Sequence, residues 1–229
     1  MGFKFPYRVK LLGKKYLNHN VVQFRIEKPY GYTHSPGQAL ELSIAKPGYE
    51  LAVAPFTISN LNTDGYLELT IKIHPHKKSL TYGMATLESG DFLQITDPWD
   101  SYNYKGPGMF IAAGTGITPF LPILESLEAQ GDRVDEQHSL LYANKTPEDI
   151  LYPNKLQQRL GKKCVHVLSR SRTRNTLFGR IHYGLLESLI HDVQQYFYVC
   201  GPKLFEKDIS KSLLAMGVGK RYIQTGNKF

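Results

Sequence analysis

The chain has 229 residues, of which 41% are hydrophobic and 21% charged, so it can form one large domain or two ordinary ones and is not intrinsically disordered. Its formal net charge is +8, and the excess lies in two stretches without an acidic residue, 1–25 and 151–182. Such an excess of positive charge attracts anionic partners, and the candidates are a phosphate-bearing cofactor, nucleic acid, an acidic protein and an anionic membrane surface. The alternative interpretation is a basic face that is simply solvated.

The sequence also restricts the compartment and the metal chemistry. No run approaches the roughly 18 apolar residues that a transmembrane helix needs, and residues 1–12 lack the apolar stretch of a secretory signal. Two cysteines, Cys164 and Cys200, are too few for a disulfide framework or a four-thiolate cluster. We therefore expect a cytoplasmic protein with no integral membrane segment and no metal site.

The first hundred residues have the pattern of antiparallel β-structure. Apolar and polar residues alternate in residues 38–47, 66–75 and 92–96, as they do in half-buried strands. Three turn signals rich in Gly, Pro, Asn, Asp or Ser accompany them: SPGQ, NTDG and ESGD. Short strands separated by such turns predict an antiparallel barrel or sandwich.

From residue 105 onward, strands alternate with helices. Four apolar runs predict buried parallel strands: MFIAAG, HSLLYAN, CVHVLSR and YFYVCGP. Helical patterns occupy residues 117–131, 146–161 and 203–217, and Thr146 is the expected cap of the second. The predicted fold class is therefore β plus α/β, with an antiparallel β-barrel in residues 1–104 and a doubly wound parallel sheet in residues 105–229.

Ligands of an open parallel sheet bind beyond the carboxyl ends of its strands, and three motifs fall there. GTGITP (114–119) joins a strand to a helix, where glycines let the backbone approach a phosphate; the alternative is a plain turn. VCGP (199–202) puts Cys200 at a strand end, where a small buried residue is the alternative. In LSRSRTRNTLFGRI (168–181), Ser169 and Arg170 suit a phosphate monoester, such as a 2′-phosphate, and a solvated basic loop is the alternative.

A fourth motif, APFTISN (54–60), is by itself an ordinary strand. Together and in this order, the four motifs resemble the ferredoxin–NADP reductase family, and the resemblance covers essentially the whole chain. In that family, a flavin-binding antiparallel barrel precedes a nicotinamide-nucleotide-binding α/β domain. APFTISN lies where the family carries Arg-x-Tyr-Ser/Thr, and GTGITP, CGP and the LSR to GRI segment match its nucleotide motifs.

The resemblance implies two residues at the reacting atoms. Thr57 would hydrogen-bond near flavin N5, and Cys200 would position the nicotinamide ring near its C4. Further residues are implied to bind the flavin: Phe56, Thr57, Ile58, Ser59, Ile71, Lys72, Ile73, Lys78, Ser79, Leu80, Thr81 and Phe229. Others are implied to bind the nicotinamide nucleotide: Gly114, Thr115, Gly116, Thr118, Pro119, Ser169, Arg170, Arg180, Cys200, Gly201 and Pro202.

Two positions depart from the family pattern. Ala54 stands where the family has an arginine, and Phe56 stands where it has a tyrosine. The flavin site thereby loses a phosphate counter-charge and a hydroxyl, so FMN remains an alternative to FAD. His76, Lys77 and Lys78 are the candidates to replace the lost charge.

The resemblance implies an oxidoreductase that passes electrons between NADPH, or alternatively NADH, and an acidic one-electron carrier such as ferredoxin or flavodoxin. The alternatives are a reductase of free flavin, ferric chelates or quinones, the reductase component of a larger electron-transfer system, and a flavin-binding sensor without turnover. A nucleic-acid-binding module is disfavoured, because the sequence has no recognised motif for one. No nucleophile–base pair is evident, and these histidines are interpreted as structural or exposed: His74, His76, His138, His166, His182 and His191.

Overall fold

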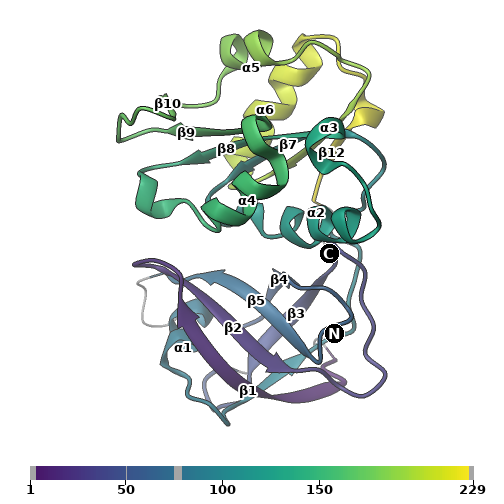
Figure 1. Cartoon of the computed structure of the whole chain (residues 1–229). Coiled ribbons are helices and arrows are strands. Elements are labelled where there is room, and N and C mark those ends of the chain that lie inside the picture. The colour runs from purple at the N-terminus through teal and green to yellow at the C-terminus, as the bar shows by residue number, and fades with distance from the viewer. Residues whose placement is uncertain (1–3, 50, 75–78, 227–229) are drawn as a thin grey trace. The chain divides into compact units, whose positions relative to one another are not determined.

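The computed structural model describes residues 4–49, 51–74 and 79–226, which divide into two compact units (Figure 1). The first unit ends at Asn103 and also includes Leu121–Ile123, and the second unit begins at Tyr104. No helix in the described ranges is long and apolar enough to cross a membrane.

The first unit is an antiparallel sheet that almost closes on itself. Its strands are β1 (Tyr7–Tyr16), β2 (Val21–Glu27), β3 (Ala39–Ile44), β4 (Ala54–Thr57), β5 (Tyr66–Lys72) and β6 (Phe92–Ile95), in the order β4-β3-β6-β1-β2-β5. An isolated antiparallel bridge joins Ile58 to Leu69 of β5, and the Ser59 N–H donates to the Glu68 carbonyl at 2.8 Å. These contacts connect the two edges, and the predicted antiparallel barrel is confirmed.

The prediction that β3 and β5 are half-buried is wrong, because the polar faces of both strands are covered. All six residues of β3 are buried, including Glu41 and Ser43, and the Ser43 hydroxyl donates to the Tyr49 carbonyl at 2.9 Å. In β5, Glu68 and Thr70 are also buried, beneath the segment that carries Ser59. The segment after β3 therefore covers polar residues of β3, and the segment after β4 covers polar residues of β5. In the sequence, the alternation of these polar residues with apolar ones had indicated a face exposed to solvent.

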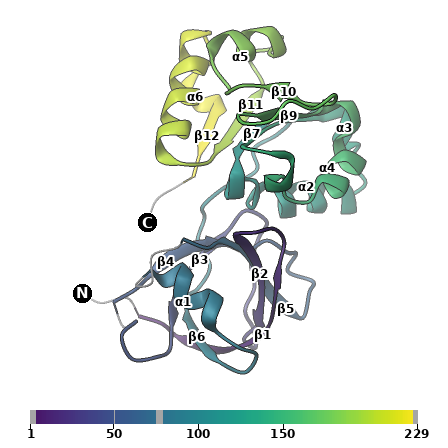
Figure 2. The same ribbon diagram turned by 90° about the vertical axis from the view of Figure 1, so that its left-hand side faces the viewer.

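The second unit is an entirely parallel sheet with helices on both faces. Its strands are β7 (Gly108–Ala113), β8 (His138–Asn144), β9 (Cys164–Leu168), β10 (Leu177–Phe178), β11 (Tyr196–Cys200) and β12 (Ile223–Thr225), in the order β10-β9-β8-β7-β11-β12. Its α-helices are α2 (Phe120–Ala129), apart from Leu121–Ile123, α3 (Val134–Gln137), α4 (Pro153–Leu160), α5 (Tyr183–Leu189) and α6 (Lys203–Ala215). Helices α5 and α6 cover one face of the sheet, and α2, α3 and α4 cover the other (Figure 2). The predicted doubly wound sheet is confirmed.

One predicted helix is interrupted. The sequence pattern indicated a single helix in residues 146–161, but the structure has a 3₁₀ turn at Pro147–Asp149 and then α4 from Pro153. Thr146 does cap the first turn, with Asp149 as its reciprocal partner. Tyr152 separates the two segments, because its φ of 53° is left-handed and cannot continue a right-handed helix.

Candidate functional site

The turn that follows β7 packs tightly on the end of β11. A Cβ atom on Gly116 would lie 2.2 Å from the Cys200 carbonyl oxygen and 2.9 Å from the Gly201 nitrogen, so only glycine fits there. Gly114 has a φ of +56°, and its Cβ position faces open space. The structure therefore brings the two strand-end motifs of the sequence into direct contact, beside backbone that a ligand can approach.

The Cys200–Gly201 turn is held from its other side by the first turns of α6. The Gly201 N–H donates to Oε1 of Glu206 at 3.2 Å. A Cβ atom on Gly201 would lie 2.7 Å from the Phe205 ring, and Pro202 is the N-cap of α6. The sequence analysis did not single out Glu206, because nothing in the helical pattern distinguishes it from the other charged residues of α6.

The remaining residues of the glycine-rich motif lie in a 3₁₀ turn, Gly114–Ile117, that leads into α2. The Thr118 N–H donates to the Thr115 carbonyl at 3.1 Å, and Pro119 immediately precedes α2. The Tyr142 hydroxyl, on β8, donates to the Gly114 carbonyl at 2.9 Å. Burial raises the pKa of Tyr142, so this hydroxyl stays protonated and keeps its donor role. Tyr142 therefore fixes the turn, a role that no local sequence signal indicated.

The loop after β9 begins at the same edge of the sheet. The Ser169 N–H donates to the Asn144 carbonyl at 3.0 Å, and the Arg170 N–H donates to the Lys145 carbonyl at 2.8 Å. Arg170 and Arg180 are exposed, and neither has a carboxylate partner among the described residues. Arg172 lies 4.0 Å above the Phe178 ring. The loop thus offers guanidinium groups that an anionic ligand can use.

In the first unit, the structure separates the two hydroxyls of the APFTISN segment. Thr57 is half-buried at the end of β4, and its hydroxyl has no hydrogen-bond partner among the residues described. Ser59 is buried, and its hydroxyl lies within hydrogen-bond distance of Glu68 and Thr70. Phe56 packs against the barrel core, and Ile58 is part of that core. Only Thr57 therefore presents an unengaged side-chain hydroxyl here.

The residues expected near the flavin at the end of β5 and beyond it differ in what they expose. The side chains of Ile71 and Leu80 belong to the barrel core, so only their backbone can reach a ligand. Lys72 and Ile73 are half-buried, and the Ile73 N–H donates to the Asn20 carbonyl at 2.7 Å. The expected flavin residues Lys78 and Phe229 lie outside the described residues, as do His76 and Lys77.

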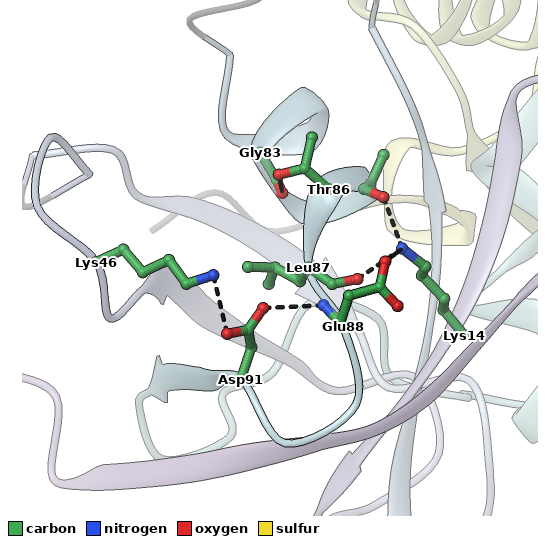
Figure 3. A network of polar contacts seen from close by, with 8 residues as sticks. Lys14, Lys46, Gly83, Thr86, Leu87, Glu88 and Asp91 are labelled. Atoms are coloured by element: carbon green, nitrogen blue, oxygen red, sulfur yellow. Dashed lines mark hydrogen bonds and ion pairs between the residues drawn. The ribbon is translucent and has the colours of Figure 1, made fainter.

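The helix α1 (Leu80–Thr86) is anchored at both ends. At its beginning, the Ser79 hydroxyl accepts from the Tyr82 N–H at 3.2 Å, and the Thr81 hydroxyl accepts from the His74 N–H at 3.1 Å. At its end, Nζ of Lys14 donates to the Ala85 and Leu87 carbonyls at 2.9 and 2.6 Å (Figure 3). The contacts of Ser79 and Thr81 hold the start of α1, and these two residues belong to the segment KSLT that was expected to bind a phosphate.

Among the residues that the structure describes, two neighbouring titratable groups are both neutral. Sγ of Cys164 lies 3.5 Å from Nε2 of His166, but burial raises the pKa of the thiol to about 11 and lowers the pKa of the imidazole, so both are neutral. His138 contacts the Tyr104 hydroxyl at 3.0 Å, and His182 caps α5. Across residues 4–49, 51–74 and 79–226, no group of three His, Cys, Asp or Glu residues could hold a metal ion.

These residues offer backbone and side-chain donors of the kind that a flavin and a dinucleotide need. The second unit has a glycine turn with open space at Gly114 and exposed guanidinium groups after β9. The first unit has the Thr57 hydroxyl, which has no partner among the described residues, and the anchored start of α1. The donor set therefore suits ligands rich in phosphate and ring heteroatoms.

Comparisons with known proteins agree with this site chemistry. Residues 7–92 match a family model described as an FAD-binding domain, and residues 110–211 match one described as an oxidoreductase NAD-binding domain. NADH-cytochrome b5 reductase 1 of Dictyostelium discoideum is 30% identical over 237 residues, which cover 96% of this chain and 81% of that protein. An NADH-cytochrome b5 reductase-like protein of Arabidopsis thaliana is 32% identical over 64% of this chain and 48% of its own length.

Solved structures share the fold. A ferredoxin NADP⁺ reductase from Neisseria gonorrhoeae, with bound FAD and NADP, has a TM-score of 0.82 at 20% identity and covers 97% of this chain and 98% of its own. The FAD/NAD-binding domain of a nitric oxide dioxygenase from Vibrio cholerae has a TM-score of 0.81 at 22% identity, covering 94% and 96% of the two chains. Among the sequence relatives, the chain spans only about half of two proteins. It covers 48% of the Arabidopsis relative and 54% of the NADH-cytochrome b5 reductase 1 of Aspergillus oryzae.

Fold, site and matches together define an oxidoreductase that uses FAD and a nicotinamide nucleotide. The chain belongs to the ferredoxin–NADP reductase family.

Proposed function

We propose that the chain is the reductase component of a larger electron-transfer system, which takes electrons from NAD(P)H and delivers them to a separate acceptor protein. The observation that carries the proposal is the packing of the Gly114–Ile117 turn on the Cys200 end of β11, which leaves the backbone at Gly114 open to a phosphate-bearing ligand. The names of the relatives, which are NADH-cytochrome b5 reductases and nitrate reductases, support this reading over a reductase dedicated to ferredoxin or flavodoxin.

The two parts of the chain have separate tasks in this proposal. Residues 1–104 bind FAD and residues 105–229 bind the nicotinamide nucleotide. FAD, when bound, supplies a ring that accepts a hydride at N5 and releases electrons singly. The Thr57 hydroxyl, which has no partner among the described residues, is available to hydrogen-bond that ring. Cys200 and Gly116, whose backbones pack against each other, would hold the nicotinamide, so the protein would contribute orientation rather than covalent chemistry.

The loop after β9 decides the choice of nucleotide. It carries four arginines and no acidic residue between Ser169 and Arg180, which favours the 2′-phosphate of NADPH. The names of the relatives specify NADH. We propose that this chain accepts both nucleotides and prefers NADPH through Ser169 and Arg170.

The acceptor is proposed to be an acidic protein. The chain has a formal net charge of +8, with acid-free stretches at residues 1–25 and 151–182, and such charge speeds encounter with an acidic partner. Ferredoxin, flavodoxin and haem proteins of cytoplasmic systems are candidates. A reductase of free flavin, ferric chelates or quinones is the second candidate function. The acceptor rate tests it, because steering makes the rate with an acidic protein fall steeply as salt rises, whereas reduction of an uncharged quinone does not depend on such steering.

An anaerobic absorbance titration tests the proposal. Purified protein should show flavin bands that bleach on addition of one equivalent of NADPH, and more slowly with NADH. A preparation that stays colourless after FAD and FMN are added would refute the flavin reading. A flavin that neither nucleotide bleaches would instead support a sensor without turnover.

A further inference from the structure

The order of strands in the second sheet assigns the two ends of a bound dinucleotide. The arginine-rich loop follows β9, the glycine turn follows β7, and Cys200 ends β11, in the spatial order β9-β8-β7-β11. An anion at the arginines and a pyrophosphate at the glycine turn place the nicotinamide ring at the end of β11. This assignment rests on the proposed function, namely that the chain binds a nicotinamide nucleotide.

A carboxylate lies at that same end of β11. Oε1 of Glu206 accepts the Gly201 N–H at 3.2 Å, one residue beyond Cys200. The Gly201 backbone is confined between the Phe205 ring and Ala113, since a Cβ atom would lie 2.7 Å from the ring and 3.0 Å from the Ala113 side chain. The packing therefore keeps the negative charge of Glu206 beside the turn, and the half-buried site limits its screening by water.

The charge matters because the nicotinamide ring changes charge in the reaction. The ring is neutral in NAD(P)H, and it becomes a cation when it gives up a hydride, that is, one proton and two electrons to the flavin. A fixed carboxylate near the ring attracts the cation and leaves the neutral ring unaffected. It therefore stabilises the positive charge that develops as the hydride leaves.

We infer that Glu206 is a specificity-determining residue, which makes this site discriminate the oxidised from the reduced nicotinamide ring by charge. Its hydrogen bond to Gly201 has a second effect, because it orients the turn on which Cys200 lies. The two effects are separable: glutamine preserves the hydrogen-bond acceptor and removes the charge, whereas alanine removes both.

The test measures binding without electron transfer. The FAD-loaded protein is titrated, with its flavin oxidised, with NADP⁺ and with tetrahydro-NADP, an unreactive analogue whose nicotinamide ring is neutral. Glu206→Gln should raise the dissociation constant of NADP⁺ about tenfold and change that of the neutral analogue by less than twofold. Asp208→Asn is the matched control, because it removes the same charge from an exposed position two residues away, and it should change both constants by less than twofold.

The outcomes separate this inference from the proposed function. If Glu206→Gln weakens both probes equally, Glu206 acts only on the structure of the turn and the inference is wrong. If neither constant changes, or if Asp208→Asn reproduces the effect, a specific role of Glu206 is likewise refuted. If wild-type protein binds neither probe, the nucleotide-binding function itself fails and the inference falls with it. Melting temperatures of both variants establish that each is folded.

Discussion

The substitution Gly116→Ala tests whether contact between the glycine turn and β11 sets the nucleotide position. The added Cβ would lie 2.2 Å from the Cys200 carbonyl oxygen, and ordinary van der Waals contact begins at 3.4 Å, so the turn must retreat by about 1.2 Å. Both partners are backbone and neither can rotate away. Displacement of this size at a reacting centre slows reaction about a hundredfold.

The assay is anaerobic stopped-flow bleaching of the flavin by NADPH. We expect the limiting rate to fall about a hundredfold in Gly116→Ala, while the FAD content is unchanged because the substitution lies in the nucleotide-binding unit. Gly131→Ala is the matched control, because its φ of +88° costs about 1–2 kcal/mol of backbone strain, its Cβ meets no atom within 4 Å, and it lies after α2, outside the proposed site; its rate should stay within twofold of wild type. A Gly116→Ala rate within threefold of wild type would refute the reasoning.

Three further predictions follow from the same contacts. Arg170→Ala should raise the Michaelis constant for NADPH at least tenfold and leave that for NADH nearly unchanged, since only NADPH carries the 2′-phosphate; equal effects would contradict the assignment. Lys14→Met should lower the free energy of unfolding in urea by about 1.5–3 kcal/mol, because the charged hydrogen bonds at the end of α1 are lost, whereas exposed Lys15→Met should change it little. Burial lowers the pKa values of His34, His138 and His166 below 6.5. Below pH 6.5 the unfolded chain therefore binds protons that the folded chain does not. The free energy of unfolding should be largest above pH 6.5 and should decrease as the pH drops through the lowered pKa values. The midpoints of urea unfolding at pH 7.5 and 5.5 measure this loss of stability. The substitution His191→Gln, at an exposed position, should not alter the difference between them. Equal midpoints at the two pH values would show that the prediction is wrong.

Thr57 and Ser59 show how closely related residues acquire different roles. Both hydroxyls belong to APFTISN, and their spacing places them on one face of an extended strand. The strand ends at Thr57, and the bridge between Ile58 and Leu69 turns Ser59 into the barrel, where Glu68 and Thr70 contact it. The ladder with β5 therefore leaves a single hydroxyl available to a ligand.

The elements of the second unit could largely be predicted from the sequence, because hydrophobic periodicity and capping are local properties. HSLLYAN corresponds to β8, and the residues that end the predicted helices, such as Gly131, lie where expected. The strands β1 and β2 carried a usable signal in the alternation of Val9 with Arg8 and of Phe24 with Arg25, although their individual bounds were not predicted. The break at Tyr152 was not predictable, because a left-handed φ in a non-glycine residue leaves no pattern.

The sequence by itself determined the order of strands, helices and glycine turns, and through them the family and its cofactors. Only the tertiary structure decided which of these residues meet. Gly116 and Cys200 are 84 positions apart, and they touch because β7 and β11 are neighbours in a parallel ladder. The tertiary structure also decided that Ser43 and Glu68 are buried and that Glu206 reaches Gly201. Contacts of this kind depend on the pairing of distant strands, which periodicity along the chain does not encode.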